Sequence, residues 1–183
     1  KIVILLVVFL LLFFNSLVSY AVNSNPSIIA NSAILMDSST ERILYSKNES
    51  KKLYPASTTK ILSAILVIEN CNLDDTVTVP YEAISIIPSG YTVADLQVGE
   101  KLTVRQILEL ALVPSANDAA NTLAFCVSDS IEDFANLMNK KVADLGLTNT
   151  HFTNPSGIHD NNHYTTAYDL AIIMKYCMKN PAF

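Results

Sequence analysis

Residues Ile61–Ile68 form an apolar run, "ILSAILVI", interrupted only by one serine and preceded closely by another serine and a lysine. The stretch from Ser57 to Ile68 predicts a helix, and a helix of this composition has almost no polar face. Such a helix is stable only where other parts of the protein cover it on all sides. We therefore expect a buried helix in the middle of the domain, with Ser57 and Lys60 at its beginning.

A hairpin and a mainly helical block are expected around this helix. Two short strands, Ser32–Asp37 and Arg42–Lys47, flank the turn-forming sequence "SSTE" and predict an antiparallel hairpin. A capping-box pattern at Thr103–Gln106 and the helix-stopping Pro114 mark a further helix. The remaining prediction is a strand within residues 74–80, helices at 103–113, 117–127, 131–146 and 167–178, and an irregular loop at 148–164. This mixture predicts an α/β domain of the α+β type.

The beginning of the chain predicts a secretory signal peptide. Residues 2–14 are all apolar behind the positive charge of Lys1, and Ser19 and Ala21 provide a small-x-small cleavage pattern. The run is shorter than the ~18–20 residues that favour a membrane span. We expect residues 1–21 to be removed and residues 22–183 to function outside the cytoplasm. An uncleaved membrane anchor is the alternative.

Charge and cysteine content exclude some classes of function. Without residues 1–21, the chain has 11 basic and 17 acidic side chains, a net charge of −6, which argues against a nucleic-acid partner. The three cysteines, Cys71, Cys126 and Cys177, are far apart and odd in number. This is neither a disulfide framework nor a zinc pattern, and we expect small buried hydrophobic side chains.

The spacing of Ser57 and Lys60 indicates nucleophilic catalysis. Residues three apart on a helix share a face with ~4.5 Å of axial rise between them, so the amine can reach the hydroxyl. A serine hydroxyl is a poor nucleophile until a base takes its proton, and lysine is a base only when burial lowers its pKa. The apolar helix offers that burial, so we expect a largely deprotonated Lys60. The alternative is that Ser57 caps the helix and Lys60 extends to water.

A second polar pair follows Pro114 in the sequence "VPSANDAAN". Inside a helix, Ser115 and Asn117 would point in different directions, whereas in an extended turn they project to the same side. There the hydroxyl can relay a proton to a leaving amine, and the carboxamide can hold a peptide bond. Helix capping by Ser115 with Asp118 is the alternative, and it leaves Asn117 unexplained.

Together these residues resemble a known family. Ser57-Thr58-Thr59-Lys60 and Ser115-Ala116-Asn117 are similar to the S-x-x-K and S-x-N motifs of penicillin-recognising serine enzymes. The text "YPASTTK", "VPSANDAAN" and "THFTNPSGIHDNNHYTTAYDLAIIMKY" resembles the low-molecular-mass D-alanyl-D-alanine carboxypeptidases, from about Ser32 to Phe183. The resemblance implies a penicillin-binding/β-lactamase-like transpeptidase fold, with an antiparallel sheet and a helical subdomain.

The resemblance also implies roles for individual residues. Ser57 would be the acylated nucleophile, Lys60 the general base, Ser115 the proton shuttle and Asn117 a substrate-binding residue. The implied substrate is a peptidoglycan stem peptide ending in D-Ala-D-Ala, β-lactams would be covalent inhibitors, and no cofactor or metal is implied. The implied location is the bacterial cell envelope, with a membrane tether beyond these residues left open.

One departure concerns the third motif of the family, K-T-G, which occurs nowhere in the 183 residues. Because the chain starts with Lys1 and stops directly after a helical pattern, we expect a fragment whose C-terminal strands, including this motif, are missing. Residues 22–183 would then be the N-terminal and helical part of an incomplete catalytic domain, and inactive or nearly so alone. The strands that complete the sheet of the hairpin would be missing as well.

Three further interpretations remain open. A serine β-lactamase shares the first two motifs, but class A enzymes use a loop glutamate to activate water, and no glutamate follows Glu132 here. A non-catalytic wall-binding relative is the second, supported only by the absent third motif. His151, His159 and His163 lie in one loop and suggest a metal, but we expect them to stabilise the loop instead.

Overall fold

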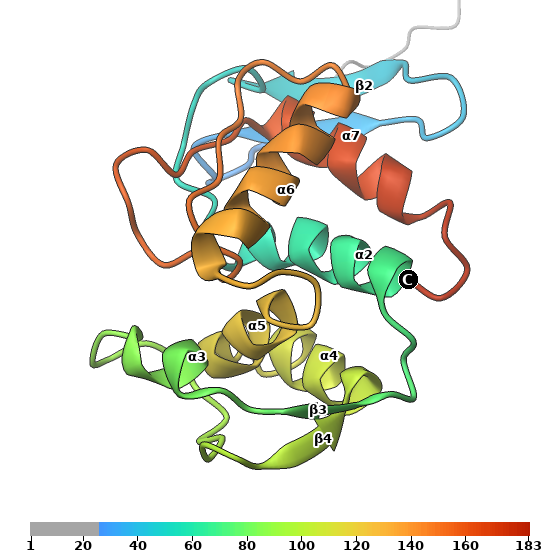
Figure 1. Ribbon diagram of the computed structural model, residues 1–183. Helices are drawn as coiled ribbons and strands as arrows, with labels where there is room; N and C mark the ends of the chain where they lie inside the picture. Colours follow the sequence, from blue (N-terminus) through green and yellow to red (C-terminus); the bar gives the residue numbers. More distant parts are fainter. Residues whose placement is uncertain (1–25) are drawn as a thin grey trace, which may run out of the picture.

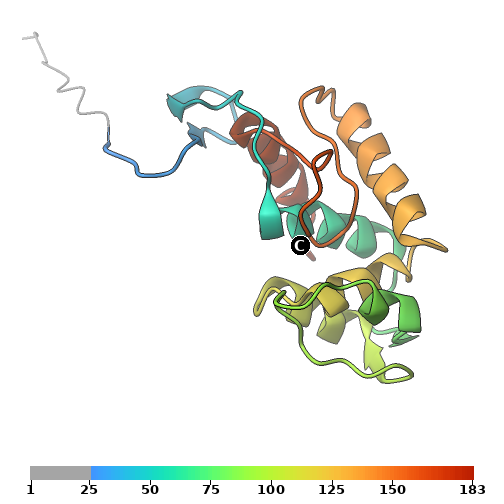
Figure 2. The ribbon, with the colours of Figure 1, turned by 90° about the vertical axis from the view of Figure 1, so that its left-hand side faces the viewer.

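The buried helix predicted from the sequence is the centre of the structure, a computed structural model that describes residues 26–183 (Figure 1). The elements are β1 (Ala33–Met36), β2 (Ile43–Lys47), the 3-10 turn η1 (Ala56–Thr59), α2 (Lys60–Asn70), β3 (Thr76–Thr78), α3 (Tyr81–Ser85), β4 (Lys101–Thr103), α4 (Val104–Leu112), α5 (Asn117–Ala124), α6 (Ile131–Asp144) and α7 (Ala167–Cys177). Helix α2 lies between two groups of elements. The β1–β2 hairpin, α6 and α7 lie on one side, and α3, α4, α5 and the β3–β4 ribbon lie on the other (Figures 1 and 2).

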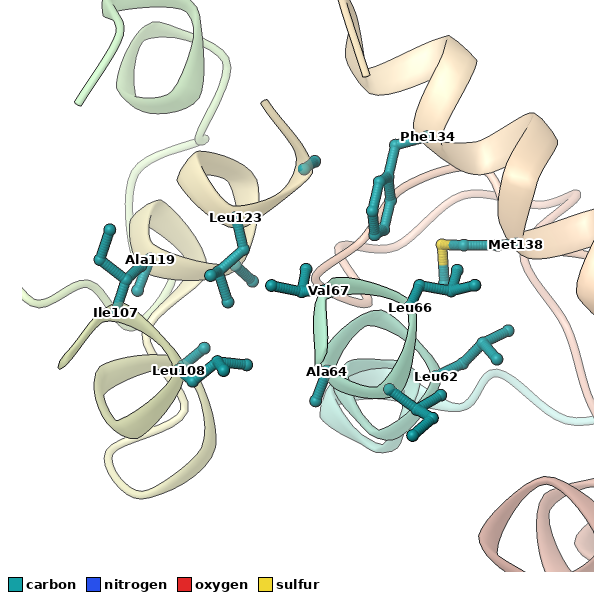
Figure 3. Close-up of a cluster of buried hydrophobic side chains, with 14 of the residues drawn as sticks. Leu62, Ala64, Leu66, Val67, Ile107, Leu108, Ala119, Leu123, Phe134 and Met138 are labelled. Atoms are coloured by element: carbon teal, nitrogen blue, oxygen red, sulfur yellow. The ribbon is translucent and has the colours of Figure 1, made fainter. Parts of the chain in front are cut away.

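Helix α2 is covered along most of its length. Seven of its eleven residues are buried, and Ile65 and Val67 are fully inaccessible to solvent. Val67 faces Leu123 of α5, whereas Leu66 points toward α6, where Phe134 and Met138 lie (Figure 3). The expectation of a central, buried helix is therefore confirmed, and this helix joins the two groups of elements into one hydrophobic core.

The antiparallel hairpin is also confirmed. Strand β1 pairs with β2 in the register Ala33 with Lys47, and the pairing shifts between Leu35 and Met36. The mixture of helices and antiparallel strands places the chain in the predicted α+β class. Helix α7 packs on α2 and β1, so its apolar side contributes to the core.

Helix boundaries follow the predicted local signals in most places. Thr103 and Gln106 form the capping box of α4, and the Ser130 hydroxyl accepts a hydrogen bond from the N–H of Asp133 at the start of α6. Helix α5 ends at Ala124, three residues earlier than predicted. Helix α3 and strand β4 were not predicted. Both are very short, and β4 exists because it pairs with β3.

Two of the three cysteines are less buried than the sequence predicted. Of the three cysteines, only Cys177 is buried, whereas Cys71 and Cys126 are half-buried, so the expectation of buried side chains is wrong for two of them.

The signal peptide predicted for residues 1–21 lies outside the described residues. Within residues 26–183, none of the helices has the length and hydrophobicity that a membrane span requires.

Candidate active site

Ser57 and Lys60 are adjacent, but not on the continuous α-helix that the sequence predicted. Ser57 lies on the 3-10 turn η1, and the α-helix begins at Lys60. A 3-10 turn also aligns residues three apart, so the consequence is the same and the Lys60 Nζ lies 3.3 Å from the Ser57 Oγ. Ser57 is exposed, whereas Lys60 is only 2% exposed. The hydroxyl therefore faces solvent and the amine lies beneath it.

The amine of Lys60 contacts four oxygen atoms. Two are good acceptors at 2.9 Å, the Asn117 Oδ1 and the Ser156 main-chain carbonyl oxygen. The other two are hydroxyl oxygens, those of Ser57 at 3.3 Å and of Ser115 at 3.4 Å. A neutral amine has two N–H donors and one lone pair. When the two short contacts take the donors, the lone pair can accept a hydrogen bond from one of the two hydroxyls at a time, and this is the arrangement a general base requires.

Burial lowers the pKa of Lys60 from 10.5 to about 8. The cause is desolvation, which disfavours the ammonium form, and among the described residues no carboxylate lies within ion-pair distance of this amine. At pH 7 a group with this pKa is neutral about one tenth of the time. The expectation of a largely deprotonated lysine is therefore wrong at neutrality. The neutral share is nonetheless roughly 300-fold larger than that of an unperturbed lysine.

Ser115 and Asn117 point to Lys60 for a different reason from the one predicted. Ser115 is not extended but left-handed, with φ +64°, and Asn117 is the first residue of α5. The N–H and the Nδ2 of Asn117 both donate to the carbonyl oxygen of Thr92, at 2.9 and 3.0 Å. These two bonds orient the carboxamide so that its oxygen faces Lys60.

The capping alternative for Ser115 is not observed. The N-cap of α5 is Ala116, and no side chain caps this helix. The carboxylate of Asp118 instead accepts hydrogen bonds from the N–H groups of Ala94 and Leu96, at 2.9 and 3.0 Å. Asp118 therefore fixes the segment that includes Thr92, and Ser115 remains available to the site.

The loop that follows α6 completes the site, and the sequence did not predict its contacts with the amine. The Ser156 carbonyl reaches Lys60, and the carbonyl of Pro155 accepts a hydrogen bond from Ser63 at 2.6 Å. The Asn154 Oδ1 accepts from the N–H groups of residues 156, 157 and 158. The motif N-P-x-G was the available signal. The asparagine folds the loop on itself, and the glycine allows the loop to approach the turn η1 that carries Ser57.

Gly157 lies directly against this turn. A Cβ atom added at Gly157 would lie 1.9 Å from the Ala56 carbonyl oxygen, and the residue has φ +85°. Ala56, immediately before Ser57, has φ +48°. Left-handed conformations at non-glycine residues are costly and often occur at functional sites. Here the turn carrying Ser57 and the loop carrying Ser156 fit together with no room for a side chain.

His163 links the same loop to the turn. It is 2% exposed, and its Nδ1 accepts a hydrogen bond from the Thr153 N–H at 3.1 Å. The proton therefore resides on Nε2, which donates to the Thr59 Oγ1 at 2.8 Å. Burial lowers the pKa of His163 to about 4, so the ring is neutral. Among the described residues no cluster suited to a metal ion exists.

The sequence matches a family of known proteins. The family model described as D-alanyl-D-alanine carboxypeptidase matches residues 20–182. The D-alanyl-D-alanine carboxypeptidase DacF of Bacillus subtilis is 39% identical over 155 residues, covering 82% of this chain and 39% of that protein. The D-alanyl-D-alanine carboxypeptidase of Streptomyces sp. strain K15 is 35% identical over 170 residues, covering 87% and 58%. The chain thus spans about two fifths to three fifths of these relatives.

Solved structures share the fold. Penicillin binding protein 5 from Haemophilus influenzae superposes with a TM-score of 0.80 at 31% identity, covering 86% of this chain and 47% of that one. A mutant of the Streptomyces K15 DD-transpeptidase superposes with a TM-score of 0.81 at 35% identity, covering 86% and 64%. The penicillin-binding fold expected from the motifs is therefore confirmed.

Gly157→Ala should destabilise the protein beyond the cost of its backbone conformation, because the new methyl group collides with Ala56. Gly99→Ala is a matched control, since Gly99 has the same φ of +85° but open space around it. We expect about 1 kcal/mol lost for Gly99→Ala and at least about 2 kcal/mol more for Gly157→Ala. Denaturant unfolding measures both. Equal losses would contradict the close fit.

The buried, neutral His163 predicts a specific pH dependence of stability. The unfolded chain protonates this histidine below about pH 6.5, whereas the folded protein does so only below about pH 4. The unfolded state thus binds more protons in this window, and the contribution of His163 to stability is lost as the pH falls from 6.5 to 4. His163→Gln should flatten the fall in melting temperature between these values. The exposed control His159→Gln should retain the wild-type slope; a wild-type slope in both variants would refute a neutral His163.

Proposed function

Because this chain belongs to the D-alanyl-D-alanine carboxypeptidase family of peptidases, we propose that it functions as a serine-type D-Ala-D-Ala carboxypeptidase. The reaction removes the terminal D-Ala from peptidoglycan stem peptides through an acyl-enzyme on Ser57. One observation carries this proposal: the buried amine of Lys60, which has no carboxylate partner within residues 26–183, lies within 3.4 Å of the hydroxyls of both Ser57 and Ser115.

The geometry supports a sequence of proton transfers. Neutral Lys60 takes the proton of Ser57 as the Oγ attacks the carbonyl carbon of the penultimate D-Ala. The proton then passes by way of Ser115 to the nitrogen of the departing D-Ala, because Lys60 contacts both hydroxyls. Water hydrolyses the resulting ester, and the same groups act in reverse order. A general base in this position contributes typically 10²–10⁴-fold to the rate.

Asn117 has a second part in this proposal besides the substrate binding that the resemblance implies. Both ends of its carboxamide are engaged within the protein, the oxygen by Lys60 and the nitrogen by the carbonyl of Thr92. These contacts support orientation of the amine of Lys60. The carboxamide keeps a second N–H donor and a second lone pair on its oxygen, and these can hydrogen-bond a substrate peptide bond.

The substrate, the inhibitors and the location are part of the same proposal. A stem peptide ending in D-Ala-D-Ala is the substrate, β-lactams acylate Ser57 in its place, and the enzyme acts in the cell envelope of a bacterium after removal of residues 1–21. Residues 22–183 are the N-terminal and helical part of the catalytic domain. Since the curated relatives are longer, the experiments below use the full-length protein encoded by the gene.

The two rival functions have less support. A β-lactamase needs a group that activates water for rapid deacylation, and the only carboxylate in the loop at 148–164 is that of Asp160. Asp160 is exposed, and one of its oxygens accepts a hydrogen bond from the Asn162 N–H at 2.7 Å. A non-catalytic wall-binding protein has no need of a buried amine directed at two hydroxyls. Burial of an amine is costly, and a catalytic role for the amine accounts for that cost.

Ser57→Ala should abolish both covalent labelling by fluorescent penicillin and release of D-Ala from diacyl-L-Lys-D-Ala-D-Ala. Lys60→Arg should reduce acylation at least about 100-fold, because arginine remains charged and cannot act as a base. In the wild type, the acylation rate should rise with pH and level off above about pH 8, the pKa of Lys60. Gel fluorescence and mass spectrometry of released D-Ala are the measurements.

Two control variants sharpen the experiment. Thr58→Ala removes an exposed hydroxyl beside the nucleophile, which donates to the Pro55 carbonyl, and Lys140→Arg changes an exposed lysine. Both should retain acylation and D-Ala release. Persistent labelling of Ser57→Ala, or rapid turnover of a chromogenic cephalosporin by the wild type, would reject the proposed nucleophile or the proposed reaction, respectively.

A further inference from the structure

Two half-buried cysteines that are distant in sequence are neighbours in the fold. Cys71 directly follows α2 as its C-cap, and Cys126 lies just beyond the end of α5, 55 positions later. The Sγ of Cys71 lies 3.5 Å from the main-chain carbonyl oxygen of Cys126. The two thiols also make a side-chain contact with each other. Helices α2 and α5 pack together, so this contact is part of the interface between the two groups of elements.

Nothing in the catalytic site uses these two thiols. Helix α2 begins with Lys60 and ends at Asn70, so Cys71 lies at the opposite end, ~15 Å along the axis. Among the described residues, the polar contacts of the two thiols are weak: Cys71 donates to the carbonyl of Cys126 and Cys126 to the carbonyl of Thr122, each at 3.5 Å. Cys177, the third cysteine, is buried and directed to the carbonyl of Ile61 at 3.9 Å. Cys71 and Cys126 thus form a pair, and Cys177, which lies apart from them, serves as the control cysteine.

From this contact we infer that Cys71 and Cys126 are a disulfide-forming pair, oxidised by a low-molecular-mass or protein disulfide such as oxidised glutathione. The thiolate of Cys71 attacks one sulfur of glutathione disulfide, forming a mixed disulfide and releasing one glutathione thiolate. The thiolate of Cys126 then attacks the Cys71 sulfur and expels the second glutathione. The two protein protons end on the two glutathione thiols, and the two electrons reduce the glutathione disulfide.

The environment of the two thiols sets the order and the speed of these steps. Burial raises the pKa of Cys71 and raises that of Cys126 to about 12, so thiolates are scarce at neutral pH. Cys71, whose pKa is less strongly raised, is the first attacking group. Formation should be slow at pH 7 and faster at pH 9. The product links the end of α2 to the end of α5, the two helices that begin with Lys60 and Asn117.

The test compares the full-length protein in oxidised and reduced glutathione at pH 8.5, followed by acid quenching and alkylation under denaturing conditions. The oxidised protein should lose two alkylatable thiols and about 2 Da of mass. Non-reducing peptide mapping should yield one linked peptide containing Cys71 and Cys126. The melting temperature should rise by about 5 °C or more, because the link closes a long loop in the unfolded chain.

Three single variants separate the possible results. Cys177→Ala should behave as the wild type, losing the free thiols of Cys71 and Cys126 and gaining the same thermal shift. Cys71→Ala and Cys126→Ala should show neither the linked peptide nor the shift. Retention of all thiols by the oxidised wild type, a linked peptide containing Cys177, or glutathione adducts that never resolve would each overturn the inference. The outcome does not depend on the proposed enzymatic activity, because none of the readouts measures catalysis.

Discussion

The site depends on one physical constraint, the burial of a single amine among neutral oxygen atoms. Lys60 has no carboxylate partner among the described residues, and its two short contacts are with an amide oxygen and a main-chain carbonyl. Carboxylates in those positions would hold the ammonium charged, whereas apolar groups would leave its N–H donors unsatisfied. Neutral acceptors meet the hydrogen-bonding needs of the amine while burial lowers its pKa. The same atom can therefore be both ordered and basic.

The surrounding fold maintains this arrangement from three directions. Helix α2 is enclosed by its neighbours, so Lys60 cannot extend to water. Helix α5 presents Asn117 and is fixed through Thr92 and Asp118. The loop after α6 contributes the carbonyl of Ser156 and is joined to the turn that carries Ser57 by His163 and by the close fit of Gly157. The left-handed residues Ala56 and Ser115 lie where these parts meet, and their backbone strain is offset by the packing around them.

Local sequence signals were sufficient for much of this structure. The composition of Ile61–Ile68 required a buried helix, the capping box placed α4, and the spacing of Ser57 and Lys60 brought the amine to the hydroxyl. Contacts between distant segments could not be predicted in the same way. The carbonyl of Ser156 belongs to the main chain, so the N-P-x-G motif marks its loop but not its contact with Lys60. The left-handed conformation of Ser115 depends on tertiary packing, and the proximity of Cys71 to Cys126 results from helix packing across 55 residues.

Direct titration of the Lys60 amine tests the central claim most directly. Lysine labelled with ¹³C at the ε carbon gives a resonance that shifts on deprotonation, and loss of one signal in Lys60→Arg identifies the residue. The account predicts a midpoint near pH 8 in the folded full-length protein, well below the ~10.4 of an unperturbed lysine. A midpoint for Lys60 at or above pH 10 would contradict the account, because the neutral fraction of the amine would then be no larger than that of an unperturbed lysine.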